Sequence, residues 1–83
     1  MISKLENCFE DLKEKFSKEK ISLIFAKFES EKLLQEVTLS LKLLENVSNE
    51  DNSKKRVIAL YNQVKEFDEF IADLIEAKHS TTI

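Results

Sequence analysis

The pattern of apolar and polar residues is most regular between residues 57 and 75. Apolar side chains recur there at alternating steps of three and four, which aligns them along one face of an α-helix. Further apolar residues border this face, so it is wider than a contact with one neighbouring helix requires. The segment therefore predicts a long helix packed against two others. The residues of its regular seam are Val57, Leu60, Val64, Phe67, Ile71 and Leu74.

Two amphipathic segments precede this one. The first begins at a capping box formed by Ser3 and Glu6 and predicts a helix over residues 3–17. After a short polar run the apolar spacing resumes, and no residue stops a helix before the polar cluster at residues 48–53. We therefore predict a second helix over residues 19–47. The inner seam that it turns toward the third helix consists of Leu34, Val37, Leu41 and Leu44.

The polar cluster at residues 48–53 contains the only concentration of turn-forming residues in the sequence. Ser48 and Ser53 are alternative N-caps for the third helix. The earlier start is preferred because it places Glu50 and Asp51 in the first helical turn, where the helix dipole stabilises acidic side chains.

The composition also favours long helices with few connections. The 83 residues include no glycine and no proline, the residues that form tight turns and breaks. The third helix is predicted over residues 50–78, followed by a flexible tail over residues 79–83. A short connection makes the second and third helices antiparallel. The predicted fold is one all-α domain over residues 1–83, an antiparallel helical hairpin with a shorter N-terminal helix that completes a three-helix bundle.

The second predicted helix is apolar on two sides, and the hairpin uses only one of them. On a helical wheel, Leu39 and Leu43 point away from the inner seam. They align with the face that carries Ile24, Phe25 and Phe28. The N-terminal helix is only about 22 Å long, at 1.5 Å per residue, and is too short to cover this whole surface. Continuous exposed apolar surface of this kind marks a partner site. We therefore predict a partner-binding surface made of Ile21, Phe25, Phe28, Leu39 and Leu43.

Candidate catalytic and metal-binding residues are few. His79 follows Glu76 at the spacing used in carboxylate-bridged di-iron bundles, but those sites need two such pairs. Cys8 lies on the apolar stripe of the first helix and is predicted to be a buried, unreactive thiol. The sequence has no evident nucleophile–base pair or phosphate-binding loop. We predict a protein that is not an enzyme and that uses no cofactor, no metal and no small-molecule substrate.

The charge of the chain narrows the class of partner. A formal net charge of -3 and a pI near 5.2 give no general attraction to nucleic acid or to anionic lipid. The longest apolar-rich stretch, residues 21–28, is too short to span a bilayer, and the acidic N-terminal segment is unlike a secretory signal. A single cysteine is typical of a reducing compartment. We expect a cytoplasmic protein that binds neither nucleic acid nor membranes.

The apolar spacing of the two long predicted helices also resembles that of a known family. Leu34, Val37 and Leu41 lie on one arm, and Tyr61, Val64, Phe67 and Ile71 lie on the other. Over roughly residues 33–77 this arrangement is similar to the small co-chaperones of type III secretion needle subunits. The resemblance implies a helical hairpin that pairs with a second, repeat-containing chaperone and keeps the needle subunit soluble in the cytosol.

Two classes of function follow from these observations. The first is a non-enzymatic protein–protein interaction protein, such as a chaperone, co-chaperone, adaptor, immunity-type protein or inhibitor, that buries an apolar helix face against its partner. The second is a structural homo-oligomer, in which two copies bury that face against each other. The partner is therefore either another protein or a second copy of the chain.

Overall fold

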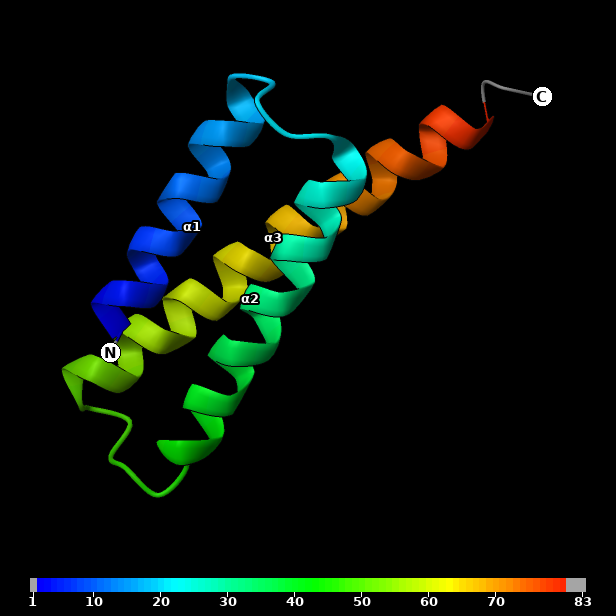
Figure 1. Ribbon diagram of the computed structural model, residues 1–83. Helices are drawn as coiled ribbons and strands as arrows, with labels where there is room; N and C mark the ends of the chain where they lie inside the picture. The colour runs from blue at the N-terminus through cyan, green and yellow to red at the C-terminus, as the bar shows by residue number, and fades with distance from the viewer. Residues whose placement is uncertain (1, 81–83) are drawn as a thin grey trace.

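The computed structural model describes residues 2–80, which form three α-helices (Figure 1). α1 spans Ile2–Ser17, α2 spans Leu23–Leu43 and α3 spans Asn52–Ser80. No strand occurs among the residues described. The predicted all-α fold of three packed helices is confirmed.

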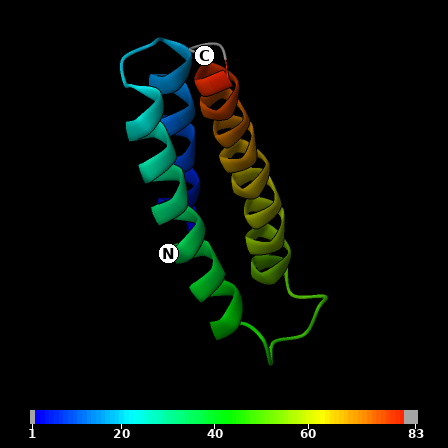
Figure 2. The same cartoon turned by 90° about the vertical axis from the view of Figure 1, so that its right-hand side faces the viewer.

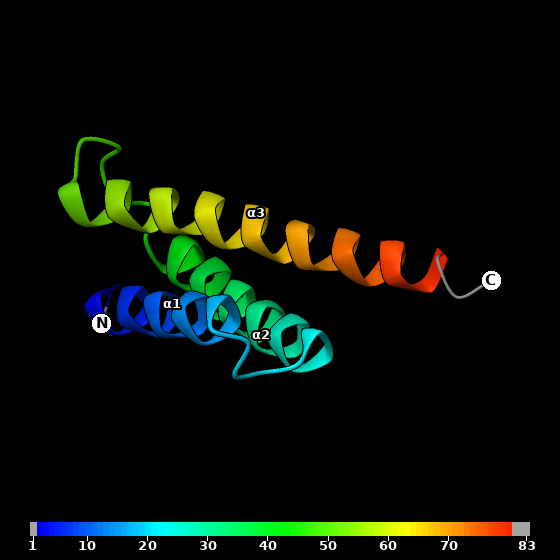
Figure 3. The same cartoon turned by 90° about the horizontal axis from the view of Figure 1, so that it is seen from above.

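α1 and α2 lie side by side, and α3 packs across both of them. Seen from above, α3 forms one layer and the two shorter helices form the other (Figure 3). α2 runs antiparallel to both of its neighbours, and the turn that joins it to α3 lies at one end of the molecule (Figure 2). The molecule is elongated, with principal extents of 50 × 22 × 15 Å. This is the predicted antiparallel hairpin with a shorter N-terminal helix packed against it.

The core lies where the three helices meet. Val37 of α2 and Val64 and Ile71 of α3 are completely buried. The predicted inner seam of α2 packs against the same cluster, although its leucines are only partly buried. The other buried apolar side chains are Leu5, Phe9, Leu12, Ala26, Leu33, Val57 and Leu60.

α1 ends in a tight turn rather than running on toward α2. Glu19 N donates to the Phe16 carbonyl oxygen at 3.1 Å, and Lys20 N donates to the Lys15 carbonyl oxygen at 2.9 Å. This pair of hydrogen bonds is a Schellman motif, which usually has glycine in its left-handed position. Glu19 occupies that position here, with φ of 57°.

α2 therefore begins later than predicted, at Leu23 instead of residue 19. Its N-cap is Ser22, whose hydroxyl accepts a hydrogen bond from Phe25 N at 3.1 Å. The cap satisfies one of the free N–H groups in the first turn of the helix. Ile21 consequently lies in the connection between the two helices and not within α2.

The C-terminal end of α2 also differs from the prediction, since the helix ends at Leu43 and not at residue 47. Leu44 N donates to the Leu41 carbonyl oxygen at 3.1 Å, and Val47 N donates to that of Leu44 at 3.0 Å. Such short-range bonds tighten the last turn and use carbonyl groups that the α-helix leaves free. Lys54 Nζ donates to the Val47 carbonyl oxygen at 2.9 Å and holds the turn against α3.

α3 starts at Asn52, and its N-cap is Asp51. The Asp51 carboxylate accepts hydrogen bonds from Ser53 N at 2.9 Å and from Lys54 N at 3.3 Å. Both predicted caps, Ser48 and Ser53, are therefore wrong. An aspartate at this position satisfies backbone donors and places its negative charge at the positive end of the helix dipole.

The C-terminal end of α3 lies beyond the predicted end at residue 78. Residues 79 and 80 belong to the helix, so the prediction of a flexible tail from residue 79 is wrong for these two positions. Residues 81–83 of that predicted tail lie outside the described part of the chain.

An aromatic cluster joins α1 to α3. The Phe67 ring makes edge-on contacts with Phe9 and Phe16, with ring centroids 5.7 and 5.6 Å apart. Phe16 also contacts Phe70, at 6.4 Å. Edge-to-face pairs of this kind add stabilisation beyond the area that they bury. The N-terminal helix packs on the wide apolar face of the third as expected, but it covers that face only in part, because Phe70 stays 52% exposed.

The only arginine of the chain, Arg56, joins the same two helices near their N-terminal ends. Its guanidinium group pairs with the Glu6 carboxylate through two nitrogen atoms, and Glu6 raises the pKa of Arg56. Arg56 Nη2 also donates to the Ser3 hydroxyl at 3.5 Å. Ser3 lies inside α1 and contacts α3, so the predicted capping box at this position is wrong.

A polar cluster lies in the contact between α2 and α3. Lys27 Nζ donates to Asp68 Oδ1 at 2.9 Å and to Glu31 Oε1 at 2.7 Å. The completely buried Ser30 hydroxyl lies 2.5 Å from Asp68 Oδ1 and 2.9 Å from the Lys27 carbonyl oxygen. A hydroxyl has one proton, so Ser30 donates to one of these acceptors at a time.

Burial lowers the pKa of Lys27, but hydrogen bonds to Glu31 and Asp68 and attraction to their charges outweigh it. The net effect raises the pKa above its ordinary value. A raised pKa in the folded state means that the pair stabilises the fold at neutral pH. That stabilisation is lost as the pH rises through the folded-state pKa of Lys27.

The first prediction tests the α2–α3 core. Leu60→Ala should lower the free energy of unfolding by roughly 2–5 kcal/mol, because it empties a buried position in the middle of the hairpin. Leu39→Ala is the matched control, since Leu39 is exposed on α2 and its truncation leaves no core cavity. Denaturant unfolding followed by circular dichroism gives both values. Equal losses in the two variants would contradict the burial of Leu60 between α2 and α3.

The second prediction concerns the polar cluster. Asp68→Ala should cost about 1–3 kcal/mol at neutral pH, because it removes an ionised acceptor shared by Lys27 and Ser30. Asp73→Ala changes the same residue type on the exposed side of α3 and should cost much less. The measurement is urea unfolding at pH 7. If the two variants lose the same stability, the cluster does not contribute to the α2–α3 contact.

Candidate protein-binding surface

The exposed side of α2, which borders the groove between α1 and α2, is the candidate functional site. We call it the outer face, and its large apolar side chains are exposed. The exposed fractions are 49% for Phe25, 63% for Phe28, 61% for Leu39 and 77% for Leu43. The prediction that these four side chains stay uncovered is confirmed for the single chain. The outer face consists of Ile24, Phe25, Phe28, Lys32, Gln35, Glu36, Leu39 and Leu43.

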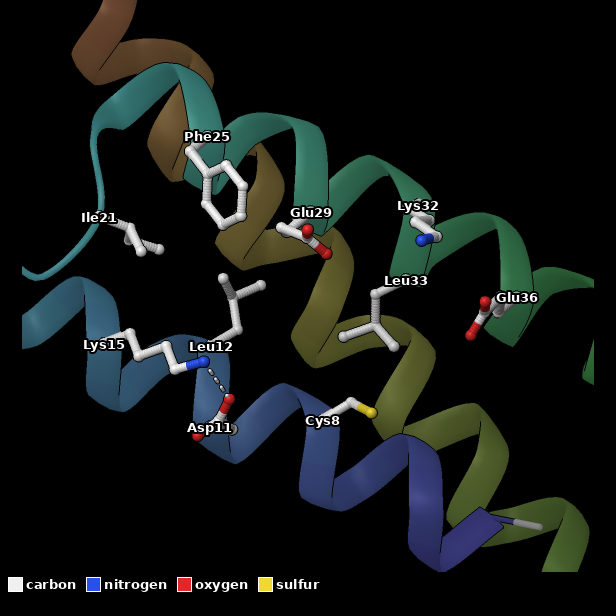
Figure 4. Close-up of a pocket in the computed structure, with 10 residues that line it drawn as sticks. All are labelled: Cys8, Asp11, Leu12, Lys15, Ile21, Phe25, Glu29, Lys32, Leu33 and Glu36. Carbon is white, nitrogen blue, oxygen red and sulfur yellow. Dashed lines mark ion pairs between the residues drawn. The ribbon is translucent and has the colours of Figure 1, made fainter.

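The fifth predicted site residue, Ile21, lies in a groove between α1 and α2. The groove has a volume of about 280 Å³ and is open to solvent. Ile21 and Phe25 point toward Leu12 of α1 across its upper end (Figure 4). Ile21 is half-buried there. Phe25 therefore belongs both to the groove and to the outer face, whereas Phe28 and Leu39 do not line the groove.

The apolar residues of the outer face form two patches and not the continuous surface that the sequence predicted. Ile24, Phe25 and Phe28 gather near the N-terminal end of α2, and Leu39 and Leu43 lie near its C-terminal end. The polar residues between them separate Phe28 from Leu39 by about 16 Å along the helix axis. A partner that covers both patches must therefore also cover the polar centre of the face.

That polar centre carries one charge of each sign, on Lys32 and Glu36. Both side chains are exposed, and both border the groove on its α2 side (Figure 4). Neither forms an ion pair with any of the side chains described, those of residues 2–78. Their charges are thus available to a partner without breaking a contact within the chain.

Two features of this surface are missing from the predicted set of site residues. Ile24 is 69% exposed and belongs to the N-terminal patch. Its signal was present, because its helical position aligns with the rest of the apolar side chains that point outward. The charges of Lys32 and Glu36 carried no such signal, since isolated charged residues are common on any exposed helix.

Cys8 is exposed at the edge of the groove, so the prediction of a buried thiol is wrong. Leu5, Phe9 and Leu12 are the buried residues of α1. Cys8 lies at the border of the apolar stripe that these residues form. It is on the side of the stripe that faces α2 across the groove. The spacing of apolar residues alone does not show which of them lie at the buried centre of a stripe and which lie at its exposed border.

Neither metal-binding nor membrane-spanning features occur in the described residues. Within residues 2–78, whose side chains the structure describes, no three or more histidine, cysteine, aspartate or glutamate side chains are grouped so that they could hold a metal ion. The side chain of His79, considered above with Glu76, lies outside the described residues. No helix in the described part of the chain combines the length and the apolar character needed to cross a membrane.

No family model matches the chain, and neither curated proteins nor solved structures give a significant match.

The third prediction tests the openness of the groove. In dilute native protein, a thiol reagent should modify Cys8 at nearly the rate observed in denaturant, because the side chain is exposed. The rates are followed by absorbance of the released chromophore. Strong protection in the native state that disappears in denaturant would instead place Cys8 inside the contact between α1 and α2.

Proposed function

We propose that this chain is a non-enzymatic protein-binding protein, of the chaperone, co-chaperone or adaptor kind, whose partner covers the outer face of α2. The inner face of the same helix packs in the core. The two roles of α2, packing in the core and binding a partner, therefore lie on different sides of the helix. The groove beside α1 extends the binding surface at its N-terminal patch.

The observation that carries this proposal is the exposure of large apolar side chains on an otherwise well-packed helix. Phe28, Leu39 and Leu43 are each more than half exposed, whereas Ala26 and Val37 on the inner side are completely buried. Removing apolar area from water stabilises a complex by roughly 25 cal/mol per Å² before the costs of association. Covering these side chains supplies the free energy for binding a protein surface.

A co-chaperone is one form of this proposal, and it is the form that the spacing of the hairpin residues suggests. In that form the hairpin presents its exposed helix face to a second chaperone. The proposal includes a cytoplasmic location, which is supported by a single exposed cysteine that a reducing compartment keeps as a thiol. The proposed partners include neither nucleic acid nor a membrane surface.

The fourth prediction tests the outer face directly. The double variant Leu39→Glu/Leu43→Glu should keep a cooperative helical melt, because both side chains are exposed in the folded chain. It should lose assembly, because a partner would have to desolvate two unpaired carboxylates. Circular dichroism reports folding. The apparent size of the tagged chain, both purified and in gentle extracts of its own cells, reports assembly.

The control is Ile58→Glu, which places one such carboxylate on an exposed apolar position of α3. The control should assemble like the unmodified chain. A double variant that is unfolded would show that Leu39 and Leu43 belong to the chain's own core. A double variant that folds and assembles normally would show that the partner binds elsewhere.

A further inference from the structure

The outer face of α2 is complementary to itself when a second α2 is laid on it in the opposite direction. With the two helices centred near Leu34, Phe25 of one copy lies opposite Leu43 of the other. Phe28 likewise lies opposite Leu39. Each N-terminal patch thus meets a C-terminal patch, and the bulky phenylalanines pack against the smaller leucines and not against each other.

Charge decides the direction of this pairing. In the antiparallel arrangement Lys32 of each copy faces Glu36 of the other, so the contact gains two opposite-charge pairs. A parallel arrangement would instead place Lys32 beside Lys32 and Glu36 beside Glu36. Juxtaposed like charges oppose association, and an interface selects the orientation that avoids them.

We propose that the partner of the outer face is a second copy of this chain, bound through α2 in an antiparallel, twofold-symmetric contact. This inference rests on the proposed function for the binding surface, and it names a second copy as the occupant of that surface in place of a second chaperone. A twofold contact uses one surface on both copies, which requires that surface to be complementary to itself. The order of the patches and charges along α2 meets that requirement.

The size of the contact sets the strength to be expected. The face from Ile24 to Leu43 is about 29 Å long and one helix wide, which is small for a stable protein–protein interface. Such a contact gives a reversible dimer whose population rises with protein concentration. Sedimentation velocity over a range of concentrations is therefore the suitable measurement.

The fifth prediction exchanges charges between copies. In a dimer of the Lys32→Glu variant, the new carboxylate of each copy faces Glu36 of the other copy. In a dimer of the Glu36→Lys variant, the new lysine of each copy faces Lys32 of the other copy. Each variant alone should dimerise at least about tenfold more weakly than the unmodified chain. An equimolar mixture of the two variants should restore dimers that contain one copy of each, because every contact then pairs opposite charges.

The mixture makes the test specific for a contact between copies, because neither chain regains an opposite charge within its own helix. Lys65→Glu and Glu69→Lys are matched controls, with the same spacing on the exposed side of α3, and should dimerise normally. Circular dichroism of each variant verifies that it is folded.

Three results would overturn the inference. They are an unmodified chain that stays monomeric at every concentration, a dimer that neither charge change weakens, and a mixture that fails to form mixed dimers. None of these contradicts the proposed function, which depends on loss of assembly in Leu39→Glu/Leu43→Glu. A monomeric chain whose cellular complex is lost in that double variant would retain the proposed function with a different protein as partner.

Discussion

The burial of the inner face of α2 between two neighbouring helices determines the rest of this structure. Val37 and Val64 are completely buried where α2 meets α3, and α1 closes the same core with Phe9. Because the buried side chains of α2 pack against both neighbours, the rotation of α2 about its own axis is fixed from two sides. That rotation leaves one side of the helix for solvent or for a partner, and it is the side on which Phe28 and Leu39 lie.

The chain has no glycine or proline, and polar side chains define the starts of its second and third helices. Ser22 and Asp51 cap the starts of α2 and α3 through hydrogen bonds to backbone N–H groups. Lys54 contacts the carbonyl oxygen of Val47 in the turn between them. Glu19 adopts the left-handed conformation that glycine would adopt more easily. The connections are therefore short and directional, and they position the groove between α1 and α2.

The periodic features of the sequence predicted the fold, and the non-periodic ones escaped prediction. A helical wheel assigns the two sides of a helix from spacing alone. It therefore placed Leu60 correctly on a buried seam and Leu39 on an exposed side. Helix ends were misplaced because the turn at Glu19 lacks the usual glycine signal. The pairing of Ser30 with Asp68 depends on which helical turns come into register, and spacing within one helix does not specify it. For the candidate site, exposure followed from the sequence, but the division into two patches required the structure.

Ala26 and Ser30 occupy successive turns of α2 and are both completely buried. Small buried side chains bring helix backbones close together, and neighbouring atoms fill the space around them. A larger side chain at either position would have to displace a backbone, and such overpacking costs about 1–3 kcal/mol. Tolerance to substitution along α2 therefore follows burial and not side-chain size. Small Ala26 and Ser30 are constrained like the larger buried Val37, whereas the large side chain of Leu43 is exposed and its replacement leaves the core unchanged.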